Sequence, residues 1–146
     1  MDRTGKAHAL AWALAVALLA ANVAGYAFDL YAAFSWFDRV LHAATILALT
    51  FWLAVMVLGD GVRTGQAVLF VVLIASVGVA IGALWEVAEW VFDHVAPGNV
   101  IKGKDDTVLD IIMDTIGAVA AAALALWFRP KPAVTATMVG GTHHVR

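Results

Sequence analysis

The feature that most constrains this chain is a run of twenty residues, 9–28, without a charged side chain. Twenty residues of α-helix rise about 30 Å, which is the thickness of the hydrocarbon core of a bilayer. A secretory signal peptide also begins with basic residues before an apolar run, but its apolar part is only about 7 to 15 residues long. We therefore expect residues 9–28 to form a retained transmembrane helix.

Three more segments have the length and apolarity of membrane spans. The last apolar run, residues 115–128, is too short to cross a core of about 30 Å at 1.5 Å per residue. That helix must therefore begin earlier and carry two aspartates into the membrane zone. The predicted spans are residues 9–28, 39–59, 67–92 and 108–128.

The composition fits a chain that consists almost entirely of these helices. Apolar residues make up 63% of it and charged residues 14%, whereas soluble domains contain about half and about a quarter. We expect an all-α integral membrane protein, a four-transmembrane-helix bundle with one domain over residues 1–130. Residues 131–146 are predicted to be a disordered cytoplasmic tail. The lipid bilayer is thus its first partner, and a net charge of −2 argues against nucleic acid.

The basic residues around the spans predict the orientation. The side of a membrane protein that is richer in Lys and Arg is usually cytoplasmic. On one side lie Arg3, Lys6, Arg63, Arg129, Lys131 and Arg146, and on the other only Arg39, Lys102 and Lys104. Both termini are therefore expected in the cytoplasm of a multi-pass cell-membrane protein.

Ionisable residues gather at the ends of three spans, all on the predicted extracytoplasmic face. Within each span they are three or four residues apart, so each set projects from one helix face. Ionisable groups inside a span are costly and usually face a partner or a cavity. We expect a shallow acidic pocket between spans two, three and four, with span one peripheral. The residues are Asp38 and His42, Glu86 and Glu89, and Asp106, Asp110 and Asp114.

Two of these aspartates also have a structural explanation. Ser35 and Asp38, like Thr107 and Asp110, form the S/T-x-x-D pattern that caps the start of a helix. Capping alone could account for both carboxylates. It cannot account for Asp114, which lies two turns inside its span.

The expected partner of Asp114 is His42 or Glu86, because only a buried partner explains a carboxylate at that depth. Small residues favour such close packing. Gly78 and Gly82 form a GxxxG pattern, which lets helices approach closely, here inside the bundle.

So many carboxylates at close range need a cation or shared protons. A divalent metal is one solution, since carboxylate oxygens suit magnesium, calcium or manganese and an imidazole extends the choice to zinc or iron. Protonated carboxylates paired across helices are the other. The absence of cysteine excludes thiolate ligands. The candidate metal ligands are Asp38, His42, Glu86, Glu89, Asp110 and Asp114; Asp38 and His42 are also the catalytic candidates, and Arg39 is the candidate substrate contact.

At these residues the sequence resembles the YjdF family of bacterial inner-membrane proteins. That family has the patterns D-R-x-x-H, E-x-x-E-W and D-x-x-x-D, which begin here at Asp38, Glu86 and Asp110, and the resemblance covers residues 37–128. It implies an inner-membrane location and supports the site, but it implies no reaction. Members of the family are longer, so this chain resembles a minimal form.

A more distant resemblance is to the VanZ-like family of glycopeptide-resistance membrane proteins. That family tends to have Asn where this chain has Asp114, and Gln where it has Glu89. The cell-envelope role that the resemblance implies is therefore weakened at two positions of the site.

Three functions fit these observations. The leading hypothesis is metal-assisted binding or chemistry on a lipid-linked envelope substrate, because the polar cluster lies at one face only. A proton or cation transporter is the first alternative, although spans two to four carry no ionisable residue in their inner halves. A structural or accessory membrane subunit is the second.

Overall fold

The structure, a computed structural model, describes residues 2–58, 67–96 and 100–128. Over these residues the chain is helical and contains no strand. The elements are α1 (Arg3–Ala27), α2 (Leu30–Ala33), α3 (Phe37–Leu53) with its π-helical continuation η1 (Ala54–Leu58), α4 (Ala67–Val95) and α5 (Lys104–Phe128). The predicted tail, 131–146, and the basic residues Arg63, Arg129, Lys131 and Arg146 lie outside the described residues.

Four of these helices are long and apolar enough to cross a membrane: α1, α3 together with the first turn of η1, α4 and α5. The prediction of an all-α, four-span membrane fold is therefore confirmed. The helices begin or end a few residues beyond the predicted spans, at Arg3, Val95 and Lys104. Polar side chains at a helix end can extend to the headgroup layer. A helix can therefore continue for several residues beyond its apolar segment.

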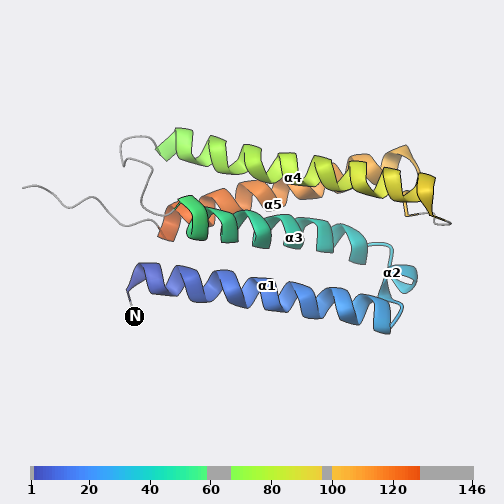
Figure 1. Cartoon of the computed structure of the whole chain (residues 1–146), viewed down its shortest axis with the longest axis horizontal. Coiled ribbons are helices and arrows are strands. Elements are labelled where there is room, and N and C mark those ends of the chain that lie inside the picture. Colours follow the sequence, from blue (N-terminus) through green and yellow to red (C-terminus); the bar gives the residue numbers. More distant parts are fainter. Residues whose placement is uncertain (1, 59–66, 97–99, 129–146) are drawn as a thin grey trace, which may run out of the picture.

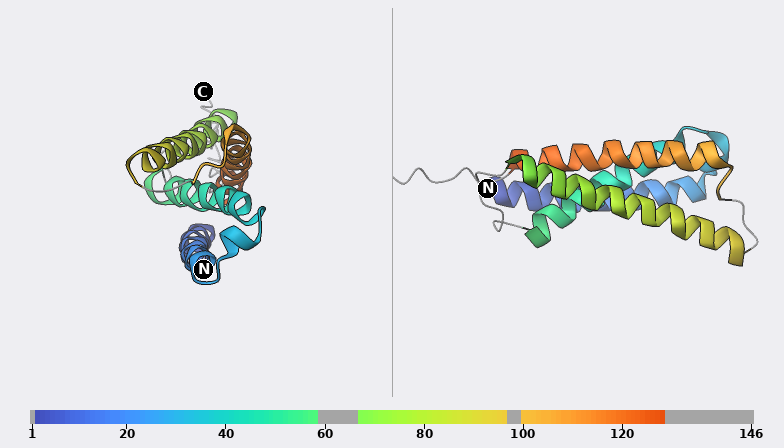
Figure 2. Two further views of the ribbon diagram at one scale, coloured as in Figure 1. Left: turned by 90° about the vertical axis from the view of Figure 1, so that its right-hand side faces the viewer. Right: turned by 90° about the horizontal axis from the view of Figure 1, so that it is seen from above.

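Helices α3, α4 and α5 form a three-helix group, and α1 lies beside α3 (Figures 1 and 2). Small residues allow this close approach. A side chain at Gly117 would fall on the backbone of Ala43 in α3, and one at Gly78 would meet Ala118 and Thr50 at 2.6 Å. The GxxxG pattern of α4 therefore packs inside the bundle, as predicted.

The start of α1 and the end of α5 lie at the same end of the bundle (Figure 1). The guanidinium of Arg3 donates a hydrogen bond to the Trp127 carbonyl at 3.2 Å, and Asp2 caps α1 by accepting from the Gly5 amide at 2.7 Å. An even number of spans requires this arrangement. Which side of the membrane this end faces stays a prediction, as does the domain boundary at residue 130.

The two halves of the bundle differ in character. The half that contains the start of α1 holds the apolar core, in which Phe51, Phe70 and Ile74 are buried against small residues of α1 and α5. The other half holds the buried ionisable residues. The fold therefore separates a solid apolar end from a polar end.

Candidate functional site

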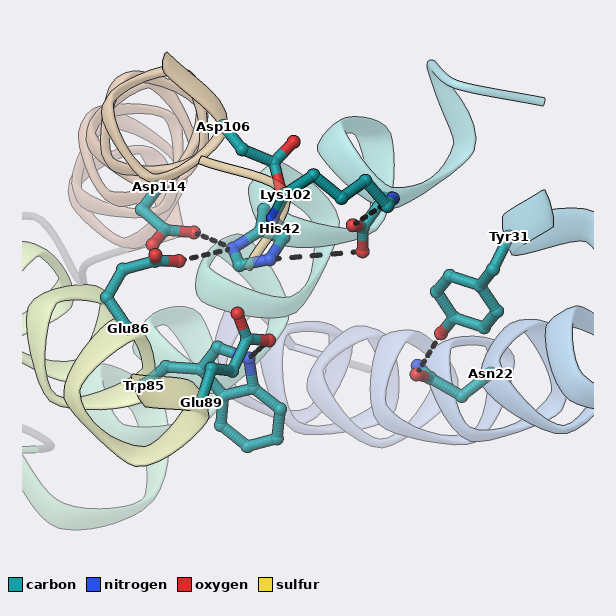
Figure 3. A network of polar contacts seen from close by, with 10 residues as sticks. Asn22, Tyr31, His42, Trp85, Glu86, Glu89, Lys102, Asp106 and Asp114 are labelled. Carbon is teal, nitrogen blue, oxygen red and sulfur yellow. Dashed lines mark hydrogen bonds and ion pairs between the residues drawn. The ribbon is translucent and has the colours of Figure 1, made fainter. Parts of the chain in front are cut away.

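His42, in the second turn of α3, lies at the centre of the polar half (Figure 3). Its Nδ1 is 3.2 Å from Oδ1 of Asp114 on α5, and the two residues are 7% and 1% exposed. The predicted partnership of Asp114 is thus confirmed, with His42 as the direct partner. When Asp114 is ionised its carboxylate can only accept, so in that state Nδ1 carries the proton of this hydrogen bond. Nε2 makes no hydrogen bond with the described residues.

Two further carboxylates flank the imidazole. Oε1 of Glu86, on α4, is 3.8 Å from Nδ1 of His42, and Oδ1 of Asp38, one helical turn before His42, is 4.0 Å from Nε2. Each ring nitrogen therefore faces an acid. The free nitrogen, Nε2, is the one on the Asp38 side.

Several buried carboxylate oxygens in this cluster accept no hydrogen bond from the described residues. They are both oxygens of Glu86, Oδ1 of Asp110 and Oδ2 of Asp114. A buried polar group without a partner is costly, and a buried charge more so, which is why native structures nearly always satisfy such groups. These oxygens call for a cation or a proton that the protein side chains do not supply.

Two sets of three residues bring their ligand atoms within 4.8 Å of one another: Asp38, His42 and Asp110, and His42, Glu86 and Glu89. His42 belongs to both sets, and together they contain five of the six predicted ligands. The sixth, Asp114, bonds to His42 and lies outside both sets. One imidazole with carboxylate oxygens is a donor set for a divalent metal.

The capping explanation of two aspartates is wrong. Helix α5 begins at Lys104, so Asp110 lies inside the helix, where it is 3% exposed. Helix α3 is capped by Trp36 without a side-chain hydrogen bond. Asp38 still complements the dipole in the first turn of α3, but neither aspartate acts as a cap.

Lys102 lies at the mouth of the cluster, and the sequence pattern did not single it out. Its Nζ is 3.9 Å from Oδ2 of Asp38. Its backbone amide donates to Oδ2 of Asp106 at 3.1 Å. The amides of the two preceding residues, Val100 and Ile101, donate to the Asp93 carboxylate at 2.8 and 2.9 Å. Asp106, one of the acidic residues predicted for the pocket, thus holds the backbone of Lys102. No local sequence motif reveals the pairing of this lysine with Asp38.

A cavity of about 870 Å³ opens beside the cluster and is walled by α1, α3 and α4. Its polar end contains Asp38, His42, Glu89 and Asp114, whereas Glu86 and Asp110 are not among its lining residues. The prediction of a shallow pocket among spans two to four is wrong in shape, because α1 supplies a whole wall. Span one contributes none of the motif residues, yet it is not peripheral to the cavity. Arg39 is half-buried and does not line the cavity, so its substrate role stays a prediction.

A hydrogen bond between the end of α1 and α2 holds the α1 wall near the site. The chain turns after α1 at Asp29, which has a left-handed φ of 54°, and the Tyr31 hydroxyl then donates to Oδ1 of Asn22 at 2.9 Å (Figure 3). Gly25 makes room for the rings of Tyr31 and Phe37. Burial, followed by nearby Tyr26, raises the pKa of Tyr31 to about 12.

Glu89 and Asp114 depend on neighbours in α4. Trp85 Nε1 donates to Oε1 of Glu89 at 2.7 Å, one turn away on the same helix. Gly82 faces Asp114 so closely that a side-chain carbon at Gly82 would fall on the Asp114 carboxylate. The second glycine of the GxxxG pattern therefore makes room for the aspartate beside His42.

The comparisons with known proteins agree with this architecture. A 35% identical stretch of 98 residues, 66% of this chain and 50% of the other protein, is shared with an "Uncharacterized protein" of Thermotoga maritima. The chain thus spans about half the length of the curated relative that it matches. No solved structure matches it. The family model that matches residues 4–131 is described as "Predicted membrane protein (DUF2238)"; neither description carries the YjdF or VanZ name, so those resemblances stay predictions. With a match over most of its length and four apolar helices, this chain is a multi-pass membrane protein that belongs to the DUF2238 family.

Proposed function

We propose that the chain binds a divalent metal cation between α3 and α5, through His42, Asp38 and Asp110, and uses it to hold the anionic group of an envelope substrate. Oδ1 of Asp110 carries this proposal. It is buried without a hydrogen-bond partner, and Asp110 belongs to a set whose ligand atoms lie within 4.8 Å. A cation would satisfy that oxygen.

The hydrogen bond between His42 and Asp114 favours this set over the one that contains Glu86 and Glu89. It occupies Nδ1, which is the nitrogen that faces Glu86. Nε2 then remains for the cation, on the side of Asp38. A carboxylate that orients a ligating histidine in this way is a recurrent feature of metal sites, so Asp114 is a positioning residue.

The charge of the cluster supports a cation as well. Asp38, Glu86, Glu89, Asp110 and Asp114 surround one imidazole. The positive side chains near these five carboxylates are Lys102, which pairs with Asp38, and Arg39, which acts electrostatically on Asp110. Like charges at such distances cannot all be ionised without a compensating positive charge. A divalent cation provides two such charges at the centre of the cluster.

A bound divalent cation would supply Lewis-acid stabilisation of a phosphoryl or carbonyl oxygen. Asp38 and His42 line the cavity, so they are the members of the set that a substrate meets. Asp38 is the proposed base for a substrate proton, because it is the most exposed of the three ligands. Glu86 and Glu89 add negative potential that holds the cation at this end of the bundle.

The two alternative functions fit the structure less well. A transport path needs polar groups through both halves, but the other half is filled by the apolar core around Phe51, Phe70 and Ile74. A structural cluster would be expected to satisfy its own buried oxygens. Four carboxylate oxygens here are without hydrogen bonds from the part of the chain that is described.

The test is a metal inventory of the purified protein, followed by Mn²⁺ titration of chelator-treated protein. We expect stoichiometric Mn²⁺ binding that is lost in Asp110→Asn. Asp105→Asn is the matched control, because Asp105 is an exposed carboxylate of α5 five residues before Asp110. Equal binding by Asp110→Asn and the wild type would refute the proposed ligand set, and loss of binding in Glu86→Gln alone would move the cation to the other set.

A further inference from the structure

The cavity beside the cluster extends deep into the membrane zone. Along α1 its wall runs from Trp12 to Tyr26, and along α3 from Trp52 to Asp38. Fourteen residues of helix rise about 21 Å, which is about two thirds of a hydrocarbon core of about 30 Å. The cavity therefore extends from the polar cluster past the middle of the spans.

The cavity ends at a pair of tryptophans. The rings of Trp12 and Trp52 meet edge to face with centroids 5.7 Å apart. Next to them in the chain, Ala11 and Phe51 are fully buried in the apolar core. Packed apolar side chains thus close the cavity at this end, whereas its opposite end is polar.

The side of the cavity faces lipid. Three of its wall residues, Leu19 on α1, Leu49 on α3 and Trp85 on α4, are 66%, 42% and 54% exposed although they line it. Helix α1 packs on α3, and α4 stands on the far side of α3 (Figure 2). An apolar chain can therefore enter sideways from the bilayer without crossing the headgroup layer.

We propose that this cavity binds a lipid phosphate, with its hydrocarbon tail along α1 and α3 and its phosphate at His42, Asp38 and Lys102. The volume of about 870 Å³ is within the range of pockets that enclose a small ligand. The proposed binding of the hydrocarbon tail rests on the shape of the cavity alone. The proposed binding of the phosphate rests on the proposed cation site.

The choice of phosphate follows from the charges at the polar end. With a divalent cation at His42, the positive groups at the mouth are that cation and the Nζ of Lys102, which the backbone contacts of Asp106 and Asp93 hold there. Phosphate oxygens bind both kinds of group well. An ammonium headgroup would have to replace the cation to be held by the same carboxylates.

The experiment uses dodecyl phosphate with a photoreactive diazirine at the end of its tail, added to the full-length protein in phosphatidylcholine nanodiscs. We expect saturable labelling of residues near the floor, around Trp12 and Trp52. Unlabelled dodecyl phosphate should compete for this labelling, and dodecyl trimethylammonium should compete at least about tenfold less well. Labelled positions are identified by mass spectrometry of peptides.

Two alanines of α1 provide matched variants. Ala15 lines the cavity, whereas Ala17 is exposed and does not. Ala15→Trp should fill the cavity and abolish the saturable labelling, and Ala17→Trp should leave it unchanged. The Ala17→Trp protein also shows that α1 tolerates a tryptophan.

The outcomes separate this proposal from the cation site. Saturable floor labelling without metal binding would leave the tail site standing and remove the cation. Metal binding with labelling that does not saturate, or that Ala15→Trp leaves intact, would overturn the tail site alone. Stronger competition by the ammonium lipid would overturn the phosphate headgroup.

Discussion

Nδ1 of His42 and Oδ1 of Asp114 lie 3.2 Å apart, although 72 residues separate them in the chain. This bond joins α3 to α5 at the centre of the polar half and orients the imidazole. Replacing Asp114 with Asn keeps the shape and a hydrogen-bonding group but removes the charge. We expect Asp114→Asn to weaken Mn²⁺ binding by about 10- to 100-fold, the usual loss for an orienting carboxylate. Thermal unfolding should change much less, and an unchanged Mn²⁺ affinity would remove Asp114 from the site.

Gly82 should be as necessary to the site as Asp114 itself. Alanine there would push against the Asp114 carboxylate and displace it from His42. Gly78→Ala is the matched control, because its added carbon meets Ala118 and Thr50, one turn further from the site. Both variants should lose about 1–3 kcal/mol of stability through overpacking. Only Gly82→Ala should also lose Mn²⁺ affinity, and equal affinity losses in the two variants would show a general effect of packing.

Alkaline pH should loosen the turn between α1 and α3 through Tyr31. Its pKa is raised from 10.0 to about 12, chiefly by burial, so the fold favours the neutral phenol. That stabilisation is complete below about pH 10 and is lost as the pH rises through about 12. Tyr31→Phe removes this pH dependence, and at neutral pH it costs about 1 kcal/mol for the bond to Asn22.

The measurement for Tyr31 is thermal unfolding as a function of pH, together with the ultraviolet absorbance of tyrosinate. Tyr26→Phe is the comparison variant: it keeps the Tyr31 phenol and so should keep the alkaline loss, at a slightly lower pH because Tyr26 is the second cause of the raised pKa of Tyr31. If wild type and Tyr31→Phe lose stability in parallel above pH 10, another group is responsible for the alkaline loss.

Lys102 should matter for ligand binding and hardly for folding. Its ion pair with Asp38 is 3.9 Å long and the lysine side chain is 55% exposed, and exposed pairs contribute about 0–1 kcal/mol. We expect Lys102→Met to unfold like the wild type while its labelling by the dodecyl phosphate probe weakens several-fold. Lys102→Arg should retain the labelling, and Lys104→Met, an exposed lysine two residues on, is the control. Full labelling of Lys102→Met would separate this lysine from the phosphate.

The orientation can be tested with single cysteines, because the natural chain has none. Ser35→Cys places a thiol at the polar end, and Thr4→Cys places one at the opposite end, near the start of α1. In intact bacterial cells that produce the protein, a membrane-impermeant maleimide should label the first and not the second. The reverse pattern would put the polar site on the cytoplasmic side.

The sequence alone was sufficient for the membrane fold and for most of the residues in the cluster. Span length follows from the thickness of the hydrocarbon core, which any apolar run must match, so four spans could be counted without coordinates. Because an ionisable group inside a span is energetically costly, His42, Glu86 and Asp114 could also be identified as candidate site residues from the sequence. Both arguments depend on the solvent and not on which helix packs against which.

The tertiary structure decided what depends on lateral packing. The sequence pattern left capping as one explanation of Asp38 and Asp110, but α5 begins at Lys104, before the predicted start of the span at residue 108, and this places Asp110 in the helix interior. The pairing of Lys102 with Asp38, the choice of Nδ1 of His42 for Asp114 and the wall that α1 gives to the cavity also come from contacts between distant segments. Lipid drives helices together only weakly, so helix neighbours are set by matched small residues such as Gly82 beside Asp114, a fit that becomes visible only when both helices are in place.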